Sequence, residues 1–170
     1  MTPPPAQLAY QVHDGQGPYL GLVHGFLSSQ AQWMLNLEAL SEVCRPVTIE
    51  LWGHGQSPAP AEPQHYTPTA YVQQFESIRS ALGAEQWFLC GYSLGAGLTI
   101  RYAHTFPDRV KAHAFTNSQS GFADAETLQS WRTDMRRTAA NIRTQGLSAI
   151  RRMPFTQDSP NVCLNRSIKL

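Results

Sequence analysis

The sequence predicts an α/β fold, a mostly parallel sheet with helices on both of its faces. Two observations lead to this prediction. From residue 8 to residue 115, short apolar runs alternate with segments whose apolar residues recur at helical spacing. Beyond Gly121 the strand pattern stops and only helical spacing remains. Alternating strands and helices are typical of a parallel sheet, because each crossover helix packs on a face of the sheet.

Two strands come first. Residues 8–12 alternate apolar and polar side chains, as a strand exposed on one face does. The turn sequence Asp-Gly-Gln-Gly at 14–17 separates this strand from a more buried one at 19–23.

A helix, a strand and a long loop follow. Apolar residues from Trp33 to Cys44 recur at helical spacing and predict a helix over about 31–43, packed on one face. The next strand is predicted at 46–51, and the stretch 53–68 is rich in Gly and Pro and predicts a loop.

The second half of the sheet region is marked by clear helix boundaries. Thr67 and Pro68 form a good helix start, and the apolar stripe from Tyr71 to Leu82 ends before Gly83. The remaining elements are a strand at 86–90, a helix at 94–106 that Pro107 ends, and a strand at 110–115.

The chain after Gly121 predicts helices without a sheet. A long amphipathic helix and a short second one are expected, with apolar positions Leu128, Trp131, Met135, Ala139 and Ile142, then Leu147, Ile150 and Met153. Residues 1–125 carry five basic and nine acidic side chains (net −4), and residues 126–170 carry eight and three (net +5). We therefore divide the chain into a sheet region at 1–121, a helical segment at 122–157 and a poorly patterned tail at 158–170.

Composition excludes several classes of function. The net charge of +1 gives no general affinity for nucleic acid or an anionic membrane. The three cysteines are too few and too scattered for a disulfide framework or a zinc site. No signal peptide or membrane span is expected, so we predict a cytoplasmic protein that binds neither membrane nor nucleic acid.

The strongest motif is Gly91-Tyr92-Ser93-Leu94-Gly95, placed directly between a predicted strand and a predicted helix. A G-x-S-x-G run in this setting forms a tight turn, and the small residues Gly91 and Gly95 let two backbone segments pass closely. The Ser93 hydroxyl is then presented above the carboxyl edge of the sheet, at the positive end of a helix. We interpret Ser93 as a nucleophile, although an ordinary turn would also accept this sequence.

Two further motifs follow neighbouring strands. After strand 19–23, the segment His24-Gly25-Phe26-Leu27 is placed to supply an oxyanion-binding N–H from Phe26, beside the N–H of Leu94. Gly25 leaves space for the backbone to approach a substrate, and we expect His24 to order the loop and not to act as a base. The turn Gly53-His54-Gly55-Gln56-Ser57 is interpreted as structural, its His and Ser holding adjacent loops.

In their order and setting, these three motifs resemble the α/β-hydrolase superfamily, from about residue 8 to residue 155. The sequence from Tyr102 to Val110 is similar to that family's exit from the nucleophile helix, and the helices after Gly121 resemble its lid. The resemblance implies a hydrolase core, a serine nucleophile, a backbone oxyanion hole, and no metal or organic cofactor.

The family's mechanism also needs a histidine base and a carboxylate, in the chain order Ser, acid, His. Only 77 residues follow Ser93, and two more strand–helix units would need roughly 60 residues beyond the sheet region. His104 lies roughly 16 Å along the helix from Ser93 at 1.5 Å per residue, which is too far. His113 is expected inside a strand, below the edge where Ser93 is displayed. His54 and His65 are expected on loops of the correct edge and remain possible bases, although we expect each of these histidines to be structural. We expect a core without its acid and His, a C-terminally shortened chain.

The resemblance implies hydrolysis of a small carboxylic ester or lactone. Within the superfamily, the motif loops resemble both enol-lactone and ester hydrolases and a menaquinone-pathway lyase that forms a cyclohexadiene carboxylate. The lyase alternative would use Ser93 as a base, and a third alternative is a catalytically incomplete binding module. The lid arginines would attract an anionic substrate or simply form a solvated helix face: Arg132, Arg136, Arg137, Arg143, Arg151 and Arg152.

Overall fold

The computed structural model describes residues 6–116 and 124–151. They belong to two compact units, one holding the sheet and one holding the helices that follow it. Each unit is described by itself below.

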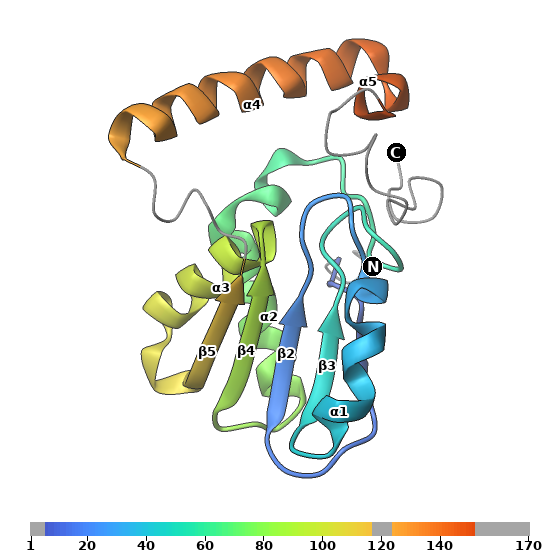
Figure 1. Cartoon of the computed structure of the whole chain (residues 1–170), viewed down its shortest axis with the longest axis vertical. Coiled ribbons are helices and arrows are strands. Elements are labelled where there is room, and N and C mark those ends of the chain that lie inside the picture. Colours follow the sequence, from blue (N-terminus) through green and yellow to red (C-terminus); the bar gives the residue numbers. More distant parts are fainter. Residues whose placement is uncertain (1–5, 117–123, 152–170) are drawn as a thin grey trace, which may run out of the picture. The chain divides into compact units, whose positions relative to one another are not determined.

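A five-stranded sheet forms the first unit, in the strand order β1-β3-β2-β4-β5. Strands β2 (Tyr19–Val23), β3 (Arg45–Ile49), β4 (Trp87–Tyr92) and β5 (Val110–Thr116) run parallel, and β1 (Tyr10–Val12) pairs antiparallel with β3. Figure 1 shows the four parallel strands ending at one common edge. The prediction of a mostly parallel sheet is confirmed, and its parallel part places the loops after β2, β3 and β4 together.

Helices cover the sheet on both sides. Helices α2 (Pro68–Ala81) and α3 (Leu94–Thr105) pack against each other, and α2 lies behind the strands in Figure 1, whereas α1 (Leu37–Ser41) lies in front of them beside β3. Thr67 caps α2, its hydroxyl accepting a hydrogen bond from Ala70 N–H at 3.3 Å, and Pro68 occupies the first turn as the sequence predicts. A short 3₁₀ turn, Pro107–Arg109, links α3 to β5.

The prediction of one α-helix over 31–43 is wrong for the first half of that segment. Its first half is a 3₁₀ helix, Gln30–Asn36, and only Leu37–Ser41 is α-helical. The side chain of Gln30 accepts a hydrogen bond from Thr48 Oγ1 at 3.1 Å, and that of Gln32 accepts one from Gly25 N–H at 3.3 Å. These hydrogen bonds to distant residues hold the 3₁₀ segment against the sheet. The spacing of apolar residues cannot predict such contacts. The loop at 53–68 also holds a 3₁₀ turn, Pro63–Tyr66.

Aromatic side chains fill the core between the sheet and helices α2 and α3. The ring of Tyr102, fully buried, lies 5.8 Å from that of Trp87 and 6.3 Å from that of Phe75. Its hydroxyl donates to Glu76 Oε2 at 2.7 Å, and Arg79 pairs with the same carboxylate at 2.6 Å. Hydrogen bonds from Arg79 and Tyr102 lower the pKa of Glu76.

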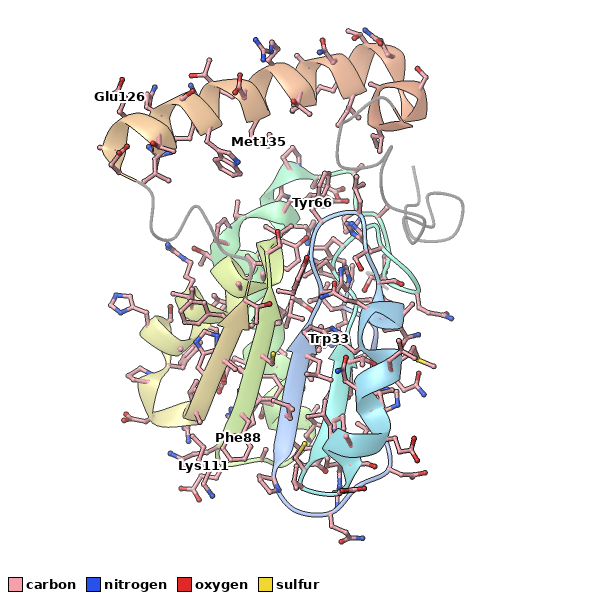
Figure 2. All side chains as sticks on the ribbon, in the orientation of Figure 1. Trp33, Tyr66, Phe88, Lys111, Glu126 and Met135 are labelled. Carbon is pink, nitrogen blue, oxygen red and sulfur yellow. The ribbon has the colours of Figure 1, made fainter. Side chains whose placement is uncertain are left out.

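The opposite edge of the sheet carries no site motif. There Lys111 and Phe88 lie together on adjacent strands in Figure 2, with the Lys111 ammonium 5.7 Å from the Phe88 ring centre.

The second unit consists of α4 (Ala125–Gln145) and α5 (Leu147–Arg151). Asp124 caps α4 by accepting a hydrogen bond from Thr127 N–H at 2.7 Å, and Gly146 ends it with φ +61°. The predicted long helix and short second helix are thus confirmed, whereas Met153 and the tail at 158–170 lie outside the described residues. Within the described ranges, no helix is long and apolar enough to cross a membrane.

Candidate active site

Ser93 lies at the sharp junction between β4 and α3. Its backbone has φ +52° and ψ −113°, a conformation that normally requires glycine. The N–H of Ser93 donates to Thr116 O at 3.0 Å, and its own carbonyl accepts from Gly97 N–H at 3.3 Å. The strained residue is therefore held from both sides, and its half-buried side chain is presented at the carboxyl edge of the sheet.

The two glycines of the motif allow this turn to form. A Cβ built on Gly91 would lie 2.5 Å from Gly95 O and 2.7 Å from Ala96 Cα. One built on Gly95 would lie 2.6 Å from His24 O, at the end of β2. Both positions exclude a side chain because backbone atoms occupy the space, which explains the need for small residues that the motif predicted.

The loop after β2 lies directly beside Ser93. A Cβ on Gly25 would be 2.9 Å from Tyr92 Cδ1 and 3.3 Å from Ser93 Cβ. The N–H of Phe26 donates to no residue in the described ranges, and Leu94 is the first residue of α3, so its N–H has no acceptor inside the helix. The structure thus brings the loop and the turn at Ser93 together and leaves both predicted oxyanion donors without a partner among the described residues.

His24 is buried below this loop and binds backbone on both of its ring nitrogens. Nδ1 lies 2.7 Å from Gly25 O, and Nε2 accepts a hydrogen bond from Leu51 N–H at 3.1 Å. Glu50, also buried, places Oε2 3.2 Å from the same Nε2. These contacts join the ends of β2 and β3 through the His24 side chain.

The turn at 53–57 holds adjacent loops through the two residues that the sequence indicated. His54 Nε2 accepts from Leu27 N–H at 3.2 Å, and Nδ1 lies 2.9 Å from Trp52 O. Ser57 donates to Glu50 O at 2.6 Å and accepts from Ala9 N–H at 2.8 Å.

A histidine base for Ser93 is not found. All six histidines of the sequence lie within the ranges that the structure describes, and none forms a hydrogen bond with the Ser93 hydroxyl. His113 places Nε2 2.9 Å from Thr99 Oγ1 in α3, and burial lowers the pKa of His113. His104 is exposed on α3, and His65 contacts Trp52 and Glu62. Among the described residues, Ser93 therefore has no histidine as a hydrogen-bond partner.

Two features of the site were not predicted. Glu50 was not singled out, although an acidic residue that directly follows a buried strand was a signal that could have found it. Leu27 has φ +59°, one of two non-glycine residues with positive φ among those described. No local sequence signal indicates this, since leucine is unusual in that conformation.

Two open hollows lie on the first unit. One of about 470 Å³ runs along α3 from Leu94 to His104, reaches Pro68 at the start of α2, and is lined mainly by apolar atoms. The other, of about 480 Å³, lies by β1 and is lined by Tyr10, among others. The first hollow includes Leu94, the residue that follows Ser93. Among the described residues, no cluster of three or more histidine, cysteine or acidic side chains has metal-ligand geometry.

Comparisons with known proteins show which family this chain resembles. A model of the α/β hydrolase fold family matches residues 18–159. The human (lyso)-N-acylphosphatidylethanolamine lipase is 36% identical over 94 residues, which cover 54% of this chain and 28% of that protein. A Bacillus subtilis protein provisionally assigned as 2-succinyl-6-hydroxy-2,4-cyclohexadiene-1-carboxylate synthase is 32% identical over 99 residues, covering 58% and 36%.

The fold is also found among solved structures. A mutant epoxide hydrolase from Bacillus megaterium superposes with a TM-score of 0.73 at 19% identity, covering 88% of this chain and 56% of that one. The chain spans about a third of the length of the two curated relatives named above.

Proposed function

The chain belongs to the α/β hydrolase fold family, and from that premise we propose that it carries the nucleophile and oxyanion half of a serine hydrolase acting on a small carboxylic ester or lactone. The observation that carries the proposal is the strained Ser93, presented beside two N–H groups, of Phe26 and Leu94, that have no partner in the described part of the chain. Strain of this kind persists where the surrounding structure holds it, and it concentrates at active sites.

The proposed reaction begins with attack of Ser93 Oγ on the substrate carbonyl carbon. The carbonyl oxygen becomes negatively charged and is held by the N–H groups of Phe26 and Leu94. Collapse of this intermediate expels the alcohol and leaves an acyl ester on Ser93, which water then cleaves to a free acid. Since no histidine side chain of this sequence forms a hydrogen bond with the Ser93 hydroxyl, the base that removes its proton is proposed to come from outside these 170 residues.

A serine at the apex of the turn favours ester hydrolysis over epoxide opening. Attack of a serine hydroxyl on an epoxide would give an ether, which water does not cleave under mild conditions. Attack on an ester gives an acyl ester, which water does cleave. Ser93 at the apex of the turn therefore supports ester or lactone chemistry over epoxide opening.

The similarity to the B. subtilis synthase favours one second candidate. In that alternative Ser93 acts as a base, the two N–H groups stabilise an enolate-like oxygen, and no acyl ester forms. An acyl group trapped on Ser93 would exclude this route.

The test is labelling of the purified chain with a fluorophosphonate probe, followed by mass spectrometry of the modified peptide. A folded triad enzyme without its base loses about 10⁴–10⁶ in turnover, so labelling is measured with and without added imidazole as an external base. We expect phosphonylation of Ser93 that increases with imidazole and disappears in Ser93→Ala.

The same sample is then mixed with a small activated ester, and the acyl adduct is sought on Ser93. If a sample with native circular dichroism shows no labelling even with imidazole, the serine-hydrolase proposal is wrong. The chain would then be better described as a binding module with this fold.

A further inference from the structure

The loop that carries the Phe26 N–H is held from the neighbouring turn by one imidazole. Leu27 N–H can only donate, so the nitrogen that accepts it, His54 Nε2 at 3.2 Å, carries no proton. The other nitrogen, Nδ1, lies 2.9 Å from Trp52 O, which can only accept, so Nδ1 carries the proton. His54 is thus fixed by its partners as a neutral ring of one tautomer.

The backbone that His54 holds is the strained part of the loop. Leu27 has φ +59°, and its side chain is buried. A bond from Ser28 N–H to Gly25 O at 3.3 Å closes the turn on the other side. Phe26 lies between these two anchors, and its ring meets that of His54 edge-on with centres 6.1 Å apart.

We propose that His54 is a positioning residue for the oxyanion site: its neutral ring keeps Leu27 in the left-handed conformation that aims the Phe26 N–H at the substrate. When His54 is protonated, its Nε2 carries a hydrogen and can no longer accept the Leu27 N–H. The hydrogen bond between them is then lost and the loop is released. The inference rests on the proposed function for its catalytic meaning, although the link between His54 and Leu27 can be tested without any reaction.

The groups around His54 support a neutral ring at physiological pH. Burial lowers the pKa of His54, and the nearby His24, whose ring centre is 5.2 Å away, lowers it further. The hydrogen bond to Trp52 O and the charge of Glu50 act in the opposite direction. The Phe26 ring, which also lies against His54, carries no charge.

Two substitutions separate the two hydrogen bonds of His54. His54→Gln can place an amide oxygen near the position of Nε2, so it keeps an acceptor for Leu27 N–H that acid cannot protonate. His54→Asn reaches only as far as Nδ1, so it keeps a donor for Trp52 O and leaves Leu27 N–H without its acceptor. His104→Gln, on the exposed face of α3, is the matched control.

The first readout is nuclear magnetic resonance of the isotope-labelled chain. In the unaltered protein we expect the Leu27 amide shift to change with pH together with the His54 ring, and to stay constant in His54→Gln. Hydrogen exchange of the Leu27 amide should be at least tenfold faster in His54→Asn and nearly unchanged in His54→Gln and His104→Gln. Unchanged exchange in His54→Asn, or a Leu27 titration that persists in His54→Gln, would overturn the proposal.

The second readout is the rate of Ser93 phosphonylation. A displacement of about 1 Å at a reacting centre can cost about 10²-fold, so we expect labelling to slow by about ten- to a hundredfold in His54→Asn. In His54→Gln the rate should be near that of the unaltered chain and lose less at acidic pH. If Ser93 is never labelled in any variant, the proposed function fails, while the resonance data still decide whether His54 holds Leu27.

Discussion

Replacing Gly95 and Gly97 by alanine tests how closely the end of β2 approaches α3. Both glycines lie in the first half of α3, so both substitutions gain the same intrinsic helix preference, about 0.5–1 kcal/mol. A Cβ on Gly97 meets nothing within 4 Å, whereas one on Gly95 would lie 2.6 Å from His24 O and 2.8 Å from Val23 C. The two variants therefore differ mainly by that one contact.

The expected magnitudes follow from this difference. Gly97→Ala should raise the free energy of unfolding by about 0.5–1 kcal/mol. Overpacking costs about 1–3 kcal/mol, and backbone atoms cannot move aside as a flexible side chain can. Gly95→Ala should therefore lower the free energy of unfolding by about 1–2 kcal/mol, and in urea its midpoint should fall about 1 M below that of Gly97→Ala.

The assay is urea unfolding followed by tryptophan fluorescence. A Trp131→Phe background removes the tryptophan of α4, leaving Trp33, Trp52 and Trp87 to report on the sheet unit. Equal slopes in urea would show that both variants unfold from equally compact states. Equal stability of the two variants, or a Gly95→Ala protein more stable than the parent, would refute the close approach of β2 and α3.

Three further predictions concern strain, pH and a buried hydrogen bond. Ser93→Gly should raise the free energy of unfolding by about 1 kcal/mol while abolishing phosphonylation, because glycine adopts the backbone conformation of Ser93 without strain. The folded-state pKa of His54 is below its ordinary value of 6.5, so its contribution to stability is complete above pH 6.5 and is lost as pH falls toward the folded pKa. Thermal or urea unfolding from pH 7 to pH 5 should therefore show a smaller loss in His54→Gln than in the parent, and an equal loss would count against this assignment. Tyr102→Phe keeps the buried ring but removes the bond to Glu76, and should lower the free energy of unfolding by about 1.5–3 kcal/mol; a change below about 0.5 kcal/mol would show that this bond contributes little.

Much of the candidate site was already present as local sequence patterns. The apolar runs and their boundaries predicted β2 without error, and the start of α2 at Pro68 and of α3 at Leu94. The spacing of Gly91 and Gly95 about Ser93 predicted a tight strand-to-helix turn. In the structure, backbone atoms occupy the space that a Cβ on Gly91 or Gly95 would need. These features depend on side-chain size and backbone preference within a few residues, which is information that a short segment contains.

Other features depend on residues far apart in the chain. The 3₁₀ geometry of Gln30–Asn36, the left-handed Leu27 and the burial of Glu50 beside His24 are set by contacts that cross between loops. Leu27 and His54 are separated by 27 positions, and no propensity or periodicity joins them. The sequence by itself determined β2, the starts of α2 and α3 and the residue at the apex of the turn, because local sterics and apolar spacing specify them. Only the tertiary structure decided which side chain holds the loop after β2, because Leu27, in a conformation that leucine disfavours, donates its N–H to His54 in the loop after another strand.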